Sequence, residues 1–325
     1  MKIQRYPLRL CPLAKSAIWG GQRLSSEWHK GGERVAESWE LCVRLSAVSV
    51  IENGAAKGMT LPEYLEAVGY DCVFPAYQKG DRFPLLVKLI DAADRLSVQV
   101  HPADEDLGPT DADGGKNELW YVVDAREGAS IVLGLSDGVS NKDFADAVGT
   151  DELEKTLCVQ PVRAGESYWI PAGLVHAIGE GILIAEIQQN SDLTYRLWDY
   201  GRRDRTGNLR PLQTEKALGV VRSFSKDEIE ALCFEKGARR DGFLTDNRYF
   251  CTEKRKISGK KEFFVCADSF EHLLCIEGEG KLVLGGESYD VRRGDSYFLP
   301  AGMGAYRAEG EWTSLASRLP ITHNT

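Results

Sequence analysis

The chain has 325 residues, of which 43% are hydrophobic and 27% charged, and its formal net charge is −9. The length favours two compact units over one average domain, and the composition excludes a disordered or fibrous chain. The acidic balance and the lack of any long Lys/Arg block argue against nucleic acid or an anionic membrane surface as a partner. An anionic substrate would therefore need a local basic pocket.

No stretch approaches the roughly 20 apolar residues that span a bilayer. The N-terminal segment does not resemble a secretory signal, because Pro7, Arg9 and Pro12 interrupt its apolar run. The eight cysteines are scattered, with no C-x-x-C pair, which is typical of buried thiols and not of disulfides or a thiolate metal site. We expect a cytoplasmic protein without a membrane partner.

In chain order, the predicted elements are mostly strands, which appear as short apolar or alternating runs ended by Gly, Pro, Asp or Asn. Two helices begin with a capping box, formed by Thr60 with Glu63 and by Ser225 with Glu228. The other predicted elements are short helices over 141–148 and 151–157 and strands over 96–100, 119–123, 130–135, 167–170, 182–188, 282–284 and 288–291, the last two joined by a tight turn at Gly285 and Gly286.

A segment in the middle of the chain recurs near its C-terminal end. Gly165-Glu-Ser-Tyr-Trp-Ile-Pro-Ala-Gly-Leu-Val-His176 returns as Gly294-Asp-Ser-Tyr-Phe-Leu-Pro-Ala-Gly-Met-Gly-Ala305. Upstream of each copy, 118–125 can be aligned more loosely with 271–278, and a slip of one residue stays open there. The repeat predicts two copies of one β-unit.

The pattern Gly-x5-Pro-x-Gly-x2-His in the first copy resembles the second motif of the cupin superfamily. This resemblance implies a jelly-roll β-barrel. Two copies imply a mainly β bicupin with two jelly-roll barrels and a few short helices packed on the first. We place a metal-binding catalytic domain in residues 1–235 and a second, degenerate cupin domain in residues 236–325.

Two of the five histidines lie in such patterns. His176 falls on the cupin ligand position, where the second copy has Ala305, so the metal is expected in the first unit only. His101 shares one face of a predicted strand with Gln99, and Glu118 opens the next strand. Two imidazoles and a carboxylate, with the Gln99 amide oxygen as a fourth candidate, suit zinc. Iron or manganese would accept a similar set.

Seven segments, taken in order, resemble the type I mannose-6-phosphate isomerases, specifically the short bacterial form. The resemblance implies one zinc ion per chain held by Gln99, His101, Glu118 and His176. The matching segments are Trp19-Gly-Gly21, Ala36-Glu-Ser-Trp-Glu-Leu41, Phe83-Pro-Leu-Leu-Val-Lys88, Ser97-Val-Gln-Val-His-Pro102, Lys116-Asn-Glu118, Pro171-Ala-Gly-Leu-Val-His176 and Gln188-Gln-Asn-Ser-Asp-Leu-Thr-Tyr-Arg196.

The same resemblance implies interconversion of mannose 6-phosphate and fructose 6-phosphate, so that the partner is a small phosphosugar. Such an isomerisation needs a base and a positive group near the enediolate oxygen. It also implies an active-site arginine at Arg196 and catalytic lysines at Lys88 and Lys116. The candidates for proton transfer are Lys116, Lys88, Asp192 and a zinc-bound water, and the sequence does not rank them.

Lys116 and Arg196 are also expected to bind substrate, together with Trp19 and Glu40. Longer family members carry a histidine where this chain has Gly115, which puts any mechanism that uses that histidine in doubt.

Ordinary alternatives stay open for these residues. Lys88 could be an edge-strand residue with its charge in water, Arg196 and Asp192 could form a structural ion pair, and Trp39 and Glu40 could be core and rim and not the floor of a pocket. At the level of function, the alternatives are a non-catalytic cupin that binds a sugar or sugar phosphate, and an isomerase of a different hexose.

Overall fold

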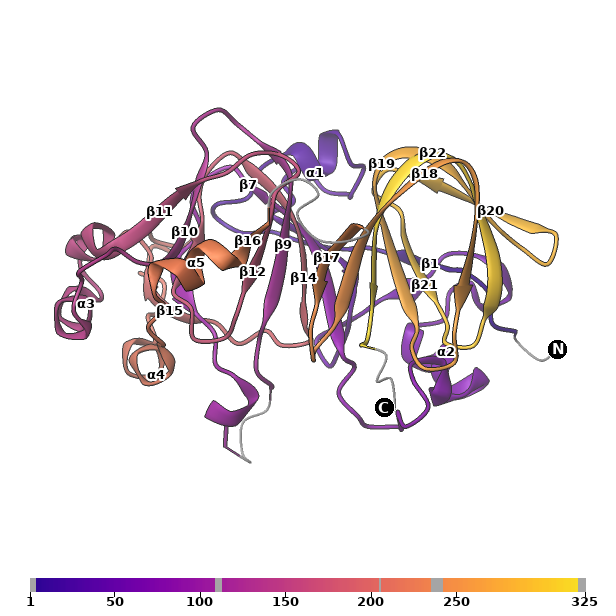
Figure 1. Ribbon diagram of the computed structural model, residues 1–325, viewed down its shortest axis with the longest axis horizontal. Helices are drawn as coiled ribbons and strands as arrows, with labels where there is room; N and C mark the ends of the chain where they lie inside the picture. The colour runs from indigo at the N-terminus through magenta and orange to yellow at the C-terminus, as the bar shows by residue number, and fades with distance from the viewer. Residues whose placement is uncertain (1–3, 109–112, 205, 235–241, 321–325) are drawn as a thin grey trace.

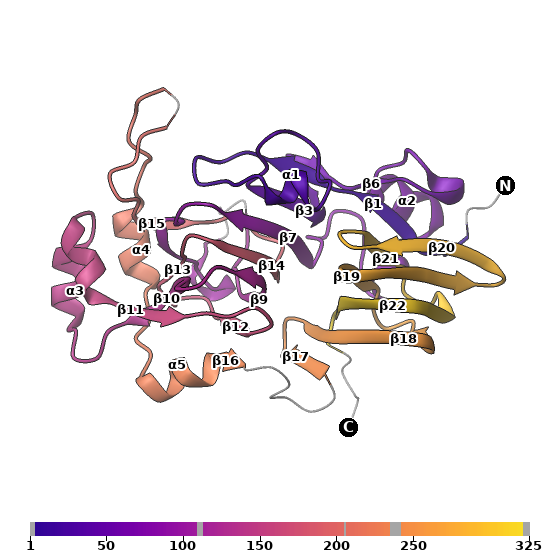
Figure 2. The same ribbon diagram turned by 90° about the horizontal axis from the view of Figure 1, so that it is seen from above.

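The fold consists mainly of β-strands, gathered into two units that lie side by side along the long axis of the molecule (Figures 1 and 2). The computed structural model describes residues 4–108, 113–204, 206–234 and 242–320. The predicted mainly β class is confirmed. None of the described helices has the length and apolar character needed to cross a bilayer.

Two sheets packed face to face make up the first unit. Ile131 and Leu133 of one sheet share an apolar core with Trp120 and Ile184 of the other. In spatial order, the seven-stranded sheet contains β16 (Cys233–Phe234), β12 (Ser167–Ile170), β9 (Glu118–Ala125), β14 (Ile182–Gln189), β7 (Leu85–Ala92), β3 (Glu37–Leu41) and β2 (Leu13–Lys15). The five-stranded sheet contains β11 (Leu157–Pro161), β10 (Ser130–Leu135), β13 (His176–Ile178), β8 (Val98–Val100) and β15 (Tyr195–Trp198).

Short helices cover the outer side of the five-stranded sheet. α3 (Asn141–Ala147) and α4 (Thr214–Val220) bury Phe144 and Ala217 in one cluster with Val100 of β8. α5 (Lys226–Leu232) instead contributes Ile229 to the core of the first unit. The predicted helix over 151–157 forms as a 3-10 helix, η4 (Asp151–Thr156).

The predicted capping boxes are present at the starts of α5 and of α2 (Leu61–Val68). However, α2 does not pack on the first unit alone. Its Tyr64 and Leu65 lie in a core between the two units that also contains Phe270 and Phe298, and Figure 1 shows α2 below β21. The expectation that the short helices pack on the first unit therefore holds for α3, α4 and α5 and is wrong for α2.

The second unit is an eight-stranded sheet that recruits strands from the N-terminal part of the chain. Leu8 of β1 pairs with Phe298 of β21, so the N-terminal strand joins the sheet of the second unit. In spatial order its strands are β17 (Phe243–Asp246), β18 (Cys251–Val265), β22 (Gly304–Arg318), β19 (Glu271–Leu284), β21 (Ser296–Leu299), β1 (Leu8–Cys11) and β6 (Val50–Ile51), with β20 (Glu287–Arg292) paired to β19.

Strand register resolves the looser part of the internal repeat. In the first unit Glu118 pairs with Ile170, and in the second Glu271 pairs with Leu299. Ile170 and Leu299 are equivalent in the repeat, because each directly precedes a Pro-Ala-Gly turn. Glu118 and Glu271 therefore occupy equivalent positions, with no one-residue slip.

The predicted turn at Gly285 and Gly286 joins β19 to β20, and both glycines have positive φ, 58° and 89°, as a two-residue hairpin turn requires. The remaining elements are a small hairpin of β4 (Val43–Arg44) and β5 (Ala47–Val48), the helix α1 (Arg23–Ser26), and the 3-10 turns η1 (Gly54–Ala56), η2 (Tyr70–Cys72) and η3 (Asp104–Asp106).

Candidate metal centre and active site

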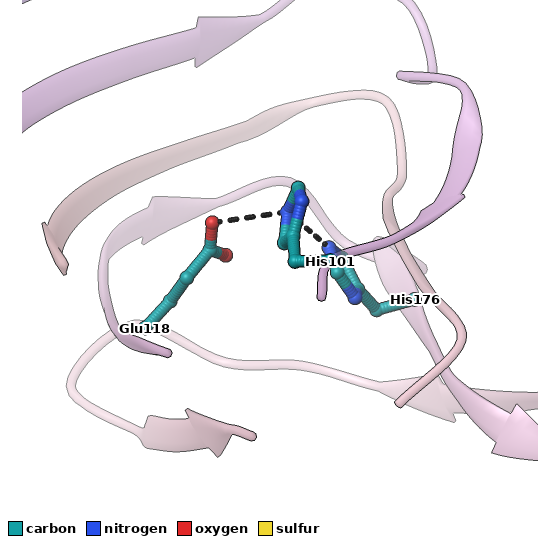
Figure 3. Close-up of side chains that lie close together, drawn as sticks. All are labelled: His101, Glu118 and His176. Atoms are coloured by element: carbon teal, nitrogen blue, oxygen red, sulfur yellow. Dashed lines mark hydrogen bonds and ion pairs between the residues drawn. The ribbon is translucent and has the colours of Figure 1, made fainter. Parts of the chain in front are cut away.

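Three potential metal ligands converge between the two sheets of the first unit (Figure 3). His101 follows β8, Glu118 opens β9 and His176 opens β13. All three side chains are buried, and their ligand atoms lie within 4.8 Å of one another. The structure thus brings together the three residues that the sequence singled out.

Hydrogen bonds fix the orientation of both imidazoles. Nδ1 of His101 lies 2.8 Å from the carbonyl oxygen of Leu193, and Nδ1 of His176 lies 2.8 Å from that of Leu174. Because a carbonyl only accepts, each Nδ1 carries the proton and each Nε2 presents its lone pair to the cluster. Second partners of this kind are typical of histidines that bind metal.

The separations fit a single dication. His101 Nε2 lies 3.1 Å from His176 Nε2 and 3.2 Å from Glu118 Oε1. Ligands around a tetrahedral zinc ion, each about 2.05 Å from the metal, would be about 3.3 Å apart. The buried Glu118 Oε1 already faces the ammonium group of Lys116, 2.6 Å away, so a metal ion would compete with Lys116 for this oxygen.

The protonation states also suit a metal. Burial, together with the charge of Lys116, lowers the pKa of His101 to about 3, and burial lowers the pKa of His176. Burial raises the pKa of Glu118, but the charge of Lys116 and the contact with His101 outweigh it and hold this pKa well below its usual range. Neutral imidazoles and a carboxylate are the forms that bind divalent ions.

Lys116 lies directly against this cluster. Its Nζ is 2.6 Å from Glu118 Oε1 and 3.3 Å from His101 Nε2, and its side chain is buried. The preceding Gly115 has no room for a side chain, because an added Cβ would lie 2.3 Å from the amide nitrogen of Asp104. A glycine at position 115, in place of a histidine, therefore allows these two backbone segments to approach closely.

On the five-stranded sheet, Gln99 stands between two other site residues. It pairs with His176 on one neighbouring strand and with Arg196 on the other, and residues that pair across strands point to the same face. The amide nitrogen of Gln99 lies 3.4 Å from His176 Nε2, while its oxygen accepts a 3.3 Å hydrogen bond from Ser97.

Arg196 is a half-buried cation at this face. Burial lowers its pKa, as does the nearby charge of Arg210. Its Nε is buried without a hydrogen-bond partner among the described residues. A buried donor without a partner is costly, so Arg196 is suited to receive an acceptor from a ligand.

A second row of side chains faces the cluster from the seven-stranded sheet. Lys88 pairs with Trp39 on one side and with Glu186 on the other, and Glu186 pairs in turn with Trp120. Lys88 Nζ lies 2.9 Å from Glu186 Oε1. The indole nitrogen of Trp120 donates to both Glu118, at 2.8 Å, and Glu186, at 3.2 Å.

Lys88 is therefore an interior residue and not an edge residue with its charge in water, because β7 lies between β14 and β3. Burial lowers its pKa, but the carboxylates of Glu186, Glu37 and Asp192 more than compensate, so that the pKa is raised.

Glu186 was missed in the sequence. Its signal was a lone carboxylate two positions before Gln188 in the apolar run 182–188, hence on the same face of the strand.

Asp192 is exposed, and its charge acts on both Lys88 and Arg196. The other two predicted substrate contacts lie elsewhere. Trp19 packs in the apolar core with Ile90. Glu40 is fully buried in an ion pair with Lys30, 2.8 Å away, on the opposite face of β3 from Trp39. The structure does not bring Trp19 or Glu40 to the cluster, so their substrate contact stays a prediction.

A mainly β fold with a buried His–Glu–His cluster defines a cupin-type protein with a site for a divalent metal. The family model of the phosphomannose isomerase type I catalytic domain matches residues 8–130, and that of the mannose-6-phosphate isomerase cupin domain matches residues 240–319. The chain belongs to the type I phosphomannose isomerase family.

Individual relatives agree with this assignment. Mannose-6-phosphate isomerase ManA of Bacillus subtilis is 35% identical, over 96% of this chain and 99% of that protein. A crystal structure of the mannose 6-phosphate isomerase from Bacillus subtilis superposes with a TM-score of 0.83 at 32% identity, covering 97% of this chain and 99% of that chain. A zinc-bound mannose 6-phosphate isomerase shares the fold, with a TM-score of 0.77 at 15% identity over 97% and 100% of the two chains.

Proposed function

We propose that this protein is a zinc-dependent isomerase that interconverts mannose 6-phosphate and fructose 6-phosphate by proton transfer through an enediol intermediate. The observation that carries the proposal is the buried cluster of His101, Glu118 and His176, with basic side chains on both facing sheets. Full-length similarity to a mannose-6-phosphate isomerase at 35% identity supports the substrate. A phosphosugar is then the small-molecule partner.

The donor set suits one zinc ion per chain. His101, Glu118 and His176 would hold it, and Gln99 would complete the set if its amide rotated to bring the oxygen toward His176. When bound, the zinc ion supplies positive charge that stabilises negative charge on a substrate oxygen. The indole of Trp120 and the carbonyls of Leu174 and Leu193 keep the ligands oriented.

The chain's own cations complete the site. Arg196 has a buried donor without a partner, so we assign it to the enediolate oxygen or to the phosphate. Lys88 has a raised pKa, so it stays charged at neutral pH and suits an electrostatic role better than proton transfer. Lys116, which contacts Glu118, binds substrate and is a candidate for proton transfer.

Two carboxylates are candidates for the base. Asp192 is exposed on the segment after β14. Burial and the charge of Glu118 raise the pKa of Glu186, which brings a carboxylate closer to the pH at which a general base is effective. Glu186 therefore joins Lys116 and Asp192 as a candidate.

We propose a bicupin architecture with two jelly-roll units, the catalytic domain in residues 1–235 and the degenerate one in residues 236–325. The equivalent register of Glu118 and Glu271 supports two copies of one unit. Expected residence is the cytoplasm, where a soluble phosphosugar would be available.

A coupled assay of fructose 6-phosphate formation tests the activity. Protein stripped of metal by a chelator should be inactive with mannose 6-phosphate and should regain turnover with one equivalent of zinc. Binding of mannose 6-phosphate without turnover under any metal would favour the non-catalytic sugar-binding alternative. Faster turnover of another hexose phosphate in the same assay would favour an isomerase of different specificity.

A further inference from the structure

The segment 190–193 connects the two faces of the site. It follows β14 and precedes β15, which carries Arg196. Its Leu193 carbonyl oxygen lies 2.8 Å from Nδ1 of His101 and so fixes that imidazole. It also carries Asp192. A small displacement of this segment would therefore turn a metal ligand and move a charged group at once.

An ion pair outside the cluster holds this segment in place. Asp113 Oδ2 accepts a 2.9 Å hydrogen bond from the backbone amide of Asp192 and lies 2.5 Å from Nη2 of Arg44. Asp113 Oδ1 accepts from the amide of Gly114 at 3.0 Å. One carboxylate thus joins the segment 190–193 to the segment that leads into Lys116 and Glu118.

We call the ion pair of Arg44 and Asp113, which holds the segment 190–193, the clip. Its arginine lies on β4, in the hairpin of β4 and β5. Arg44 Nη1 donates to the side-chain oxygen of Asn190 at 3.2 Å, and the Asn190 side-chain nitrogen donates to the carbonyl of Val43 at 2.9 Å. The side chains of Arg44 and Asp113 are only 16% and 14% exposed, so solvent screens this pair weakly compared with a surface ion pair.

We infer that Arg44 and Asp113 are positioning residues for the metal centre, which act through the Asp192 amide and the Leu193 carbonyl on His101. The inference rests on the proposed metal site. Neither residue touches the ligand atoms. Their effect is to set the position of the backbone that orients one imidazole and presents Asp192 to the site.

The groove beside this clip does not point to a second anion site. It has a volume of about 790 Å³ and is lined by both members of the clip and by Arg82. Its two cations are already paired, Arg44 with Asp113 and Arg82 with Asp104. Arg44 Nε has no hydrogen-bond partner among the described residues, but the bonds of Arg44 and Asp113 to the segment 190–193 favour a role in positioning over a role in binding phosphate.

Asp113→Ala and Asp113→Asn test the inference, with zinc affinity measured by competition with a chelator and the ligand field read from the absorption spectrum of the cobalt-substituted protein. Asp113→Ala should weaken zinc binding about 10- to 100-fold, as changes to groups behind metal ligands do, and should shift the cobalt spectrum. Asp113→Asn keeps an acceptor for the Asp192 amide but loses the ion pair, so its effect should be smaller. Arg44→Lys should retain most of the affinity.

The matched control is Asp295→Asn in the second unit. Asp295 likewise accepts a backbone amide, that of Arg292 at 2.9 Å, and lies 3.0 Å from an arginine, Arg9. This variant should leave the zinc affinity and the cobalt spectrum unchanged. The inference is overturned if Asp113→Ala leaves the zinc affinity and the cobalt spectrum unchanged, as Asp295→Asn should. If the unaltered protein bound no zinc, the proposed metal site itself would fail, which is a distinguishable result.

Discussion

Each of the two units has a buried carboxylate at the same place in the fold, but different groups compensate its negative charge. Glu118 faces two imidazoles and Lys116. Glu271, its equivalent, faces Arg255, whose terminal nitrogens Nη1 and Nη2 each lie 2.7 Å from one of its oxygens. A guanidinium in the second unit thus neutralises the carboxylate that is equivalent to a potential metal ligand of the first unit.

The other ligand positions have changed as well. Gln99 pairs with the buried His176 in the first unit, whereas the corresponding pair of the second unit, Phe264 with Ala305, is exposed. Tyr306 adds a 2.8 Å hydrogen bond to Glu271. A buried carboxylate needs a positive charge beside it. In the first unit a metal ion can supply this charge, which makes the site reactive, whereas in the second unit an arginine supplies it, which makes the pair structural.

The largest expected effect comes from exchanging the residues at the ligand position. His176→Ala should lose stoichiometric zinc and with it turnover, because two ligands remain. Ala305→His should gain no zinc, because position 305 is exposed and Arg255 already neutralises the buried Glu271. The metal content of each variant, measured by mass spectrometry after dialysis, tests both expectations. A second equivalent of zinc in Ala305→His would mean that the second unit is closer to a metal site than the Arg255 pair suggests.

Arg196→Ala should reduce kcat about 10²- to 10³-fold while zinc content stays at one per chain, because this cation would stabilise charge only as it develops on the substrate. Zinc content and kcat are measured on the same preparation. Loss of zinc along with activity would show that Arg196 supports the ligands, Gln99 above all, and has no direct part in the reaction. Arg255→Ala, at the second unit's cation, should leave kcat unchanged.

Breaking the second unit's ion pair should affect stability alone. Arg255→Met leaves Glu271 buried without its cation and should cost about 3–5 kcal/mol of unfolding free energy, whereas Arg255→Met combined with Glu271→Met should recover most of that loss. Urea denaturation of the zinc-loaded protein measures both, with zinc content as the control. A double variant as unstable as the single one would argue against a simple unpaired charge.

Much of this comparison could be predicted from the sequence. The strand predicted over 182–188 is β14 (Ile182–Gln189), and the motif around His176 assigned the metal to the first unit. A sequence repeat and the alternation of apolar residues can be recognised along the chain itself, without knowing which strands lie next to one another.

The rest depends on pairings that local patterns do not encode. The contact of Lys88 with Glu186 spans 98 residues, and that of Arg44 with Asp113 spans 69. Alternation indicates which face a side chain occupies but not which strand lies beside it. For the same reason, no local pattern in the sequence placed β1 in the sheet of the second unit.

The smallest expected effect concerns acid stability in the second unit. Burial, followed by the charge of Lys30, lowers the pKa of His272 from 6.5 to about 3. Between these values the unfolded chain binds a proton that the folded protein does not. The stability that depends on neutral His272 is therefore fully present above about pH 6.5 and is lost as the pH falls toward 3.

His272→Asn should reduce the slope of unfolding free energy against pH by up to one proton, about 1.4 kcal/mol per pH unit. Chelator-treated protein, unfolded in urea between pH 4 and 6, gives this slope, with His101 and His176 common to both proteins. His29→Asn is the control, because His29 is exposed and its positive φ of 55° suits Asn. An unchanged slope in His272→Asn, with reduced stability at every pH, would assign the buried imidazole a packing role and leave the acid sensitivity to the metal ligands of the first unit.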